Sequence, residues 1–84
     1  MIIINDKYSI KSDSNQWMIC GYRKASEKKP ALWEPFKYYV SLPACIEALR
    51  GILLRTSDYS SFADLKQNLD DINTMLKEKV KVDL

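Results

Sequence analysis

The chain has 84 residues and a formal net charge of +2. This length predicts one small domain, and the small net charge excludes an acidic mimic of DNA, which would need a strongly negative surface. The sequence contains two cysteines and no histidine, which excludes the usual zinc-binding patterns.

The apolar run Met1–Ile4 is too short for the core of a signal peptide, and no segment approaches the ~20 apolar residues of a membrane span. We therefore expect a cytoplasmic protein whose thiols stay reduced. Cys20 falls in an expected strand and Cys45 on the apolar face of an expected helix. Both are predicted to be small buried hydrophobic residues rather than a disulfide or a reactive thiol.

The N-terminal half predicts strands. Met1–Ile4 is an expected opening strand, and the alternation of apolar and polar residues in Tyr8–Lys11 indicates a half-buried strand. Turn-forming residues at Ser12–Asn15 lead into Gln16–Arg23, which has apolar residues on both faces and is expected to be central. The two longer strands are expected to form a hairpin.

A polar segment separates this hairpin from the next expected strand. Lys24–Pro35 contains two prolines and charges of both signs, and is predicted to be an exposed loop. Phe36–Val40 is the third expected strand, and short connections favour an antiparallel order.

The first expected helix begins after Ser41, whose hydroxyl can cap it. Gly51 weakens a helix interior by roughly 1 kcal/mol relative to alanine, so the helix is clear only as far as about Arg50. Arg55 near its end suits the negative end of the helix dipole. Apolar residues follow at helical spacing, at Leu42, Cys45, Ile46, Leu49, Ile52 and Leu53.

A second helix is expected after the polar break Thr56–Ser60, with Ser61 and Asp64 in a capping pattern. Lysines near its end suit the helix dipole, and Val80, Val82 and Leu84 either extend it or form a tail. Its apolar seam is expected to be covered within one chain or across a dimer, and consists of Phe62, Leu65, Leu69, Ile72 and Leu76.

These elements predict a small α+β fold. An antiparallel sheet of about three strands is followed by two helices packed on one of its faces, an order written ββ(β)αα. A chain of this size buries only ~60% of its unfolded surface, so its stability is marginal. Because a dimer would add core, we expect either a monomer or a homodimer.

Five short segments, which supply expected turns, caps and core stripes, are spread over most of the chain: Tyr8–Asp13, Gln16–Ile19, Tyr38–Leu42, Ala48–Leu49 and Arg55–Asp58. In these segments the chain resembles a family of short proteins of unknown function encoded by tailed phages and prophages. The resemblance implies a mobile-element origin, a bacterial host cell and the same ββ(β)αα fold. It implies no activity and no functional residue. Small phage proteins of this kind often bind host proteins, defence nucleases among them, which is an argument by analogy.

The candidate partner-binding residues lie in the basic half of the chain, because residues 1–40 carry a net charge of +3 and residues 41–84 a net charge of −1. Trp33 is open to two interpretations, core packing or an anchor at a protein interface. The partner-binding candidates are Arg23, Lys24, Lys28, Lys29, Trp33 and Lys37.

The sequence favours a protein-binding module that inhibits or modulates a host factor, such as a counter-defence inhibitor of the anti-CRISPR type. The alternative is a nucleic-acid-binding accessory protein that uses the same basic and aromatic surface. We expect no enzyme and no cofactor or metal, because the absence of histidine removes the commonest partner of a nucleophile. The acidic residues Asp64, Asp70, Asp71 and Glu78 are expected on a solvated helix face.

Overall fold

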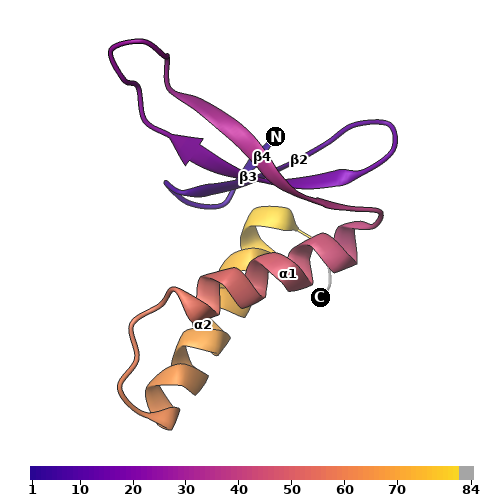
Figure 1. The fold of residues 1–84 in the computed structure, drawn as a ribbon. Coiled ribbons are helices and arrows are strands. Elements are labelled where there is room, and N and C mark those ends of the chain that lie inside the picture. The colour runs from indigo at the N-terminus through magenta and orange to yellow at the C-terminus, as the bar shows by residue number, and fades with distance from the viewer. Residues whose placement is uncertain (82–84) are drawn as a thin grey trace. The chain divides into compact units, whose positions relative to one another are not determined.

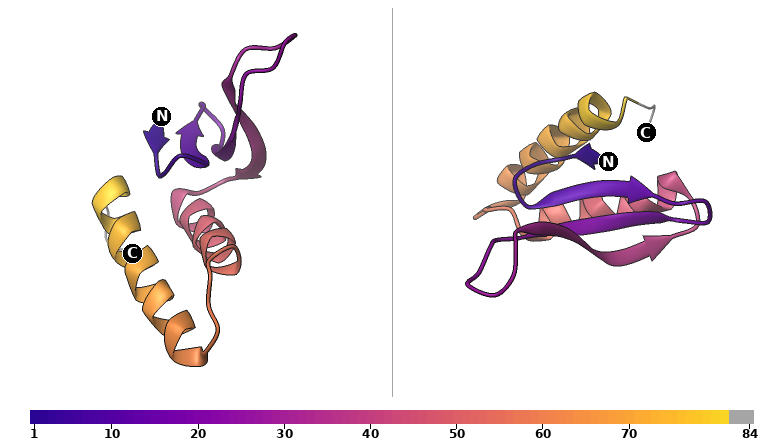
Figure 2. Two further views of the ribbon diagram at one scale, coloured as in Figure 1. Left: turned by 90° about the vertical axis from the view of Figure 1, so that its left-hand side faces the viewer. Right: turned by 90° about the horizontal axis from the view of Figure 1, so that it is seen from above.

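The N-terminal part of the chain forms a four-stranded antiparallel sheet in the computed structural model, which describes residues 1–81. The strands are β1 (Ile2–Ile3), β2 (Tyr8–Ser12), β3 (Trp17–Arg23) and β4 (Leu32–Tyr39). They follow the order β1-β2-β3-β4, and β2 to β4 lie side by side in Figures 1 and 2. Two helices, α1 (Leu42–Arg55) and α2 (Phe62–Val80), follow the sheet. The α+β prediction is confirmed, with four strands in place of about three.

The chain divides into two compact units after Cys45. The first unit contains the sheet and the first turn of α1. The second unit begins at Ile46 and contains the rest of α1 and all of α2. That the two units fold as one domain stays a prediction from the length.

Short side chains that bond to the local backbone form the turns of the sheet. Asn5 Oδ1 accepts bonds from the backbone N–H groups of Lys7 and Tyr8, both at 2.8 Å. Asp13 Oδ1 accepts from Asn15 N–H at 2.8 Å and from Gln16 N–H at 2.9 Å. The pKa of Asp13 is lowered, chiefly by the bond from Asn15. The turn predicted at Ser12–Asn15 is therefore confirmed.

The centre of the sheet is apolar on both faces, as expected for Gln16–Arg23. Ile10 and Ile19 stand directly opposite each other on β2 and β3, and both are fully buried. On the other face Ser9 stands opposite Cys20, and both are again fully buried. Both cysteines of the chain are buried and free, as predicted.

A β-bulge interrupts the pairing of β3 with β4. Ile19 pairs with Lys37 and Cys20 pairs with Pro35, so Phe36 is the extra residue. The Phe36 ring lies over Gly21, because a Cβ added there would meet ring carbons at 3.6 Å. Its centroid is also 6.2 Å from that of Tyr8. The bulge therefore turns Phe36 toward the face that carries Tyr8 and Gly21.

The prediction that Lys24–Pro35 is a loop is wrong for its last residues, since β4 begins at Leu32. Pro35 suggested a loop because proline cannot donate to a strand ladder. Proline is tolerated on edge strands and at bulges, and Pro35 lies on the edge strand beside the bulge. At the other end the strand stops at Tyr39, and Val40, which was expected in it, is 90% exposed.

Helix α1 begins as predicted, with Ser41 Oγ accepting a bond from Ala44 N–H at 3.3 Å. It runs through Gly51 and ends at Arg55, five residues beyond the clear part of the sequence pattern. The apolar residues after Gly51 explain this extension, because Leu53 is buried and its packing outweighs the modest cost of one glycine.

Polar groups organise the loop between α1 and α2. Thr56 Oγ1 donates to Ile52 O at 2.9 Å, and Asn68 Nδ2 reaches back from α2 to Asp58 O at 2.8 Å. Ser61 is the N-cap of α2, as predicted, and its Oγ accepts from Asp64 N–H at 3.1 Å. The helix ends at Val80 and Lys81 caps it, with a left-handed backbone (φ 59°) and an N–H that donates to Lys77 O at 2.8 Å. The expectations for Val82 and Leu84 lie outside the described residues.

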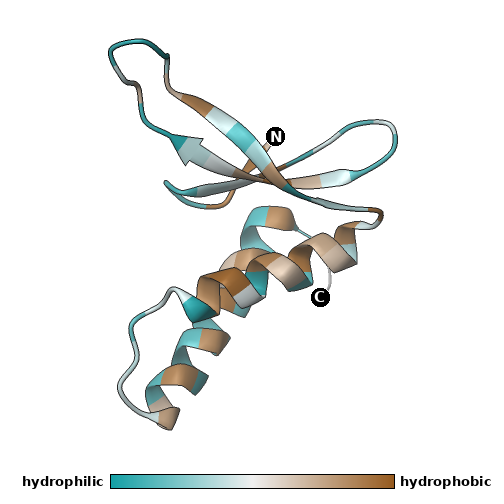
Figure 3. Cartoon of the chain, viewed as in Figure 1, coloured by the Kyte–Doolittle hydropathy of each residue, from teal (hydrophilic) through white to brown (hydrophobic). Residues whose placement is uncertain are grey.

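The apolar seam of α2 is covered at one end only. Leu76 is fully buried and Phe62 is 85% exposed, with intermediate exposure for the three seam residues between them. Apolar and hydrophilic segments alternate along this helix in Figure 3, as expected for a one-sided stripe. Asp70 and Asp71 lie on its exposed face, as predicted.

Candidate protein-binding surface

The β3–β4 hairpin carries every residue that the sequence nominated for partner binding. Its strands pair from Trp17 opposite Tyr39 to Arg23 opposite Leu32. The connecting loop ends in a tight turn, in which Ser26 N–H donates to Lys29 O at 2.8 Å and Lys29 N–H to Ser26 O at 3.4 Å. The turn gives the loop a defined shape, and Figure 3 shows it as hydrophilic.

Arg23 holds the base of this loop. Its Nε lies 3.0 Å from Oε1 of Glu34 on the neighbouring strand, and its Nη2 donates to Pro30 O at 3.2 Å. The guanidinium thus ties the end of β3 to the start of β4. Its role in the structure is to position the loop, and most of its charge is matched by Glu34.

The remaining cations of the predicted set are exposed. Lys24, Lys28 and Lys29 lie on the loop, and Lys37 lies on β4. The region 23–39 contains five basic and two acidic residues, the latter being Glu27 and Glu34. Since Glu34 is matched by Arg23, the loop presents an excess of positive charge to a partner.

Aromatic residues gather on one face of the hairpin. Tyr22 and Trp33 stand opposite each other, with ring centroids 5.0 Å apart and planes inclined at 60°. Tyr38 stands opposite Met18 further along the same face. Tyr22 is 45% exposed and Tyr38 is 54% exposed, whereas Trp33 is half-buried. This face therefore offers rigid aromatic surface of the kind that anchors interfaces.

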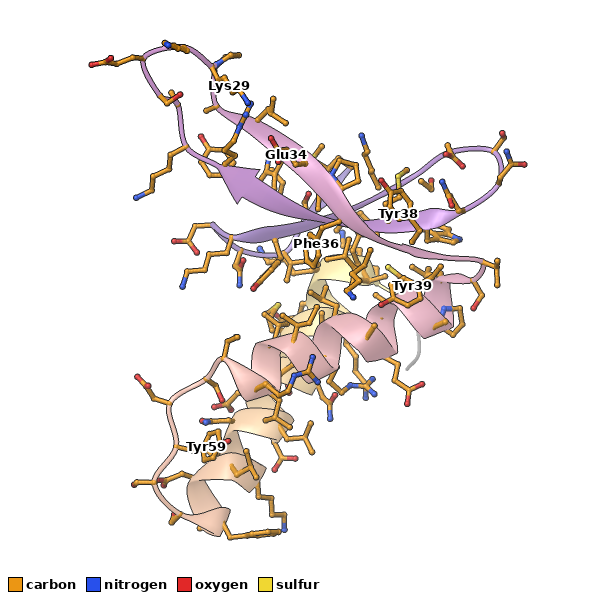
Figure 4. The ribbon with its side chains drawn as sticks, in the orientation of Figure 1. Lys29, Glu34, Phe36, Tyr38, Tyr39 and Tyr59 are labelled. Carbon is orange, nitrogen blue, oxygen red and sulfur yellow. The ribbon has the colours of Figure 1, made fainter. Side chains whose placement is uncertain are left out.

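The structure brings most, but not all, of the predicted residues together. Trp33 was placed in a loop by the sequence and lies instead in β4, held by Tyr22. Lys37 stands opposite Ile19, on the face away from Trp33. Figure 4 shows how the two faces separate, because Tyr38 and Phe36 lie on opposite sides of the β4 ribbon. The candidate surface is therefore the loop cations Lys24, Lys28 and Lys29 together with the aromatic face Tyr22, Trp33 and Tyr38.

Tyr22 and Tyr38 belong to this surface but were absent from the predicted partner-binding residues. The sequence groups them with the cations of this region only as stacking residues of the nucleic-acid alternative. The signal that identifies them is the cross-strand register, which pairs Tyr22 with Trp33 and sets Tyr38 on the same face. A one-residue bulge decides that register, and neither its presence nor its position can be read from the sequence pattern alone.

Outside the hairpin, a shallow depression of about 290 Å³, open to solvent, lies at the loop before α2 and is lined by the exposed residues Asp58, Tyr59, Ser60 and Asp64. Its polar groups are used by the helix cap, because Asp64 Oδ2 accepts bonds from Ser60 Oγ at 3.0 Å and Ser60 N–H at 3.3 Å. These bonds, that from Ser60 Oγ first, lower the pKa of Asp64. Within residues 1–81, no three His, Cys, Asp or Glu residues are grouped so that they could hold a metal ion.

The chain matches no family model, and neither a curated protein nor a solved structure shows significant similarity to it. In the described part of the chain, neither helix has the combination of length and apolar character needed to cross a membrane.

Proposed function

We propose that this chain is a small phage-derived protein-binding module that inhibits or modulates a host factor in the bacterial cytoplasm, acting by occupancy of a surface rather than by catalysis. The observation that carries the proposal is the hairpin, where the exposed Tyr22 and the half-buried Trp33 form a pair beside a loop with three exposed lysines. Rigid aromatic residues supply the contact area of an interface, and unmatched cations steer an acidic partner toward it. The phage origin and the host partner rest on the resemblance.

The loop and the aromatic pair make separable contributions. Replacing Lys28 and Lys29 by glutamate removes the steering charge, so association with an acidic protein partner should slow while dissociation changes little. Trp33→Ala removes contact area at the centre of the surface, so it should mainly speed dissociation. The test is a kinetic binding assay on folded variants, with a partner isolated from host lysate. Equal rates for the wild type and both variants would place the binding surface elsewhere, for example on the exposed faces of the helices.

A nucleic-acid-binding accessory protein is the second candidate, because exposed tyrosines beside lysines also suit stacking on single strands. Ionic strength separates the two candidates. Phosphate contacts make affinity fall steeply as salt rises, whereas an interface anchored by Trp33 depends less on salt. A pull-down with and without nuclease gives the same distinction, since capture through nucleic acid is lost on digestion.

A further inference from the structure

Within residues 1–81, strand β4 is the last strand of the sheet and one of its edges is unpaired. In the sheet order, β3 is the one neighbour of β4 among the described residues. Tyr22 N–H donates to Lys7 O at 3.0 Å, so the backbone groups of Tyr22 point toward β2. Because antiparallel pairs alternate between bonded and non-bonded positions, the residue opposite Tyr22 turns its backbone groups away from β3. That residue is Trp33.

The bulge places a second outward position five residues further on. Tyr38 stands opposite Met18, which lies an even number of residues from Tyr22 and therefore also points toward β2. In a regular strand Trp33 and Tyr38 would point to opposite edges. Since Phe36 is the extra residue, both present an N–H and a C=O at the free edge. Pro35 between them has no N–H to offer.

This edge complements itself. Strand β4 reads LWEPFKYY. We lay it antiparallel against β4 of a second copy, with a two-fold axis between Pro35 and Phe36. Trp33 then stands opposite Tyr38 of the other copy, and Glu34 stands opposite Lys37. Trp33 and Tyr38 share one face of the sheet, and Glu34 and Lys37 share the other. Opposite charges and aromatic pairs directly opposite each other are the favourable cross-strand combinations.

We propose that two copies of this chain pair through their β4 edges in this register and join their sheets into one. Trp33 and the Tyr38 of the second copy exchange two backbone N–H···O bonds, and the two-fold axis repeats the exchange. Each Glu34 carboxylate lies against the Lys37 ammonium of the other copy. Arg23 contacts Oε1 of Glu34, so the other oxygen is available for this pair.

The exposed apolar surface of β4 supports a second copy as the occupant. Leu32, Phe36 and Tyr38 are 38%, 43% and 54% exposed. Proline and bulges usually blunt an edge against pairing. Here both lie at the axis, between the two hydrogen-bonded Trp33–Tyr38 pairs, where Pro35 stands opposite Cys20 and contributes an outward C=O but no N–H. Sliding the register by two residues would set Pro35 opposite Tyr38, so the Tyr38 carbonyl would lose the N–H donor that Trp33 offers in the proposed register.

A charge exchange across the axis tests the proposal in the full chain. Glu34→Lys would place a lysine opposite Lys37 of the other copy, and Lys37→Glu would place a glutamate opposite Glu34. Because like charges directly opposite each other are destabilising, each variant alone should dimerise at least about ten times more weakly than the wild type. An equimolar mixture restores both opposite-charge pairs and should form a heterodimer. Lys66→Glu, at an exposed position on α2, is the matched control and should dimerise like the wild type. Sedimentation velocity over a range of concentrations measures all of these.

Cysteine pairing gives a readout that does not depend on charge. Residues 34 and 37 occupy a non-hydrogen-bonded pair across the axis, where the Cα separation of about 4.5 Å permits a disulfide. A mixture of Glu34→Cys and Lys37→Cys should give a cross-linked heterodimer under mild oxidation, and neither variant alone should cross-link. A wild-type chain that stays monomeric, or a mixture that cross-links no better than its components, would overturn the proposal. Association of wild type with an acidic extended peptide in preference to itself would do the same.

Discussion

Tyr22 and Trp33 meet edge to face across β3 and β4, with ring centroids 5.0 Å apart. The contact fixes the half-buried Trp33 in the strand while Tyr22 stays 45% exposed. One pair of residues thus stabilises the hairpin and forms part of the proposed binding surface. Its two roles can be separated, because stability is measured on the free chain and binding on the complex.

The stability role is tested by a double-mutant cycle with Tyr22→Leu, Trp33→Leu and the double variant. Edge-to-face aromatic pairs contribute about 0.5–1.5 kcal/mol beyond their buried area. We expect a coupling of that size in the free energy of unfolding, measured by urea denaturation. Strict additivity of the two single changes would show that the rings do not support each other.

The core role of α1 is tested at Leu49, which is fully buried. Leu49→Ala should lower the free energy of unfolding by about 2–5 kcal/mol, because it removes packed atoms and leaves a cavity. Val40→Ala is the control, since Val40 is 90% exposed and should change that free energy by less than about 0.5 kcal/mol. A loss below about 1 kcal/mol for Leu49→Ala would show that the core lies elsewhere.

The cap of α2 is tested at Ser61, whose Oγ accepts the bond from Asp64 N–H. Ser61→Ala should lower the free energy of unfolding by about 0.5–2 kcal/mol. Ser14→Ala, at an exposed turn position, is the matched control and should have little effect. If the two alanine variants melt alike in urea, the cap contributes nothing to stability.

The buried thiol of Cys45 predicts a loss of stability at high pH. Burial, with a smaller contribution from nearby Cys20, raises the pKa of Cys45 from its ordinary value of 9.0 to about 11. The folded chain therefore holds this proton to a higher pH than the unfolded chain does. The resulting stabilisation is fully present below pH 9 and is lost as the pH rises toward 11.

The measurement compares the unfolding free energy of the wild type with that of Cys45→Ala across this range. The other titratable groups are the same in both proteins, so the difference between the two isolates the thiol. We expect the wild type to lose stability relative to the variant between pH 9 and pH 11. A constant difference would mean that the Cys45 thiol ionises as readily in the folded chain as in the unfolded one.

The sequence predicts this fold where local chemistry decides the structure. Ser41 and Ser61 cap the helices as expected, and Asp13 closes the turn between β2 and β3. Prediction from the sequence fails where a long-range strand pairing overrides a local preference. Pro35 argues for a loop in isolation, but its place on an edge strand beside the bulge lets β4 extend through it. Gly51 weakens the helical pattern without ending it, and α1 ends at Arg55, directly before the predicted polar break.

The candidate surface is predicted in part for the same reason. Its lysines follow from composition, because charged residues in a polar loop are exposed wherever the loop lies. Its aromatic face depends on which residues stand opposite each other, and this register shifts at Phe36. Trp33 was therefore predicted in a loop although it lies in β4, and Tyr22 and Tyr38 were left out of the predicted partner-binding residues.

The most direct test of the proposed function compares two baits in nuclease-treated host lysate, with captured proteins quantified by mass spectrometry. The first carries Lys28→Glu with Trp33→Ala on the hairpin. The second carries Lys66→Glu with Phe62→Ala on α2, which makes the same kinds of change at exposed positions. Folding of both baits is verified by circular dichroism before the comparison, because Trp33→Ala removes the contact that stabilises the hairpin. We predict that one host protein is captured by the wild type and by the α2 bait and is lost from the hairpin bait. Equal capture by the hairpin bait would contradict the assignment of the binding surface.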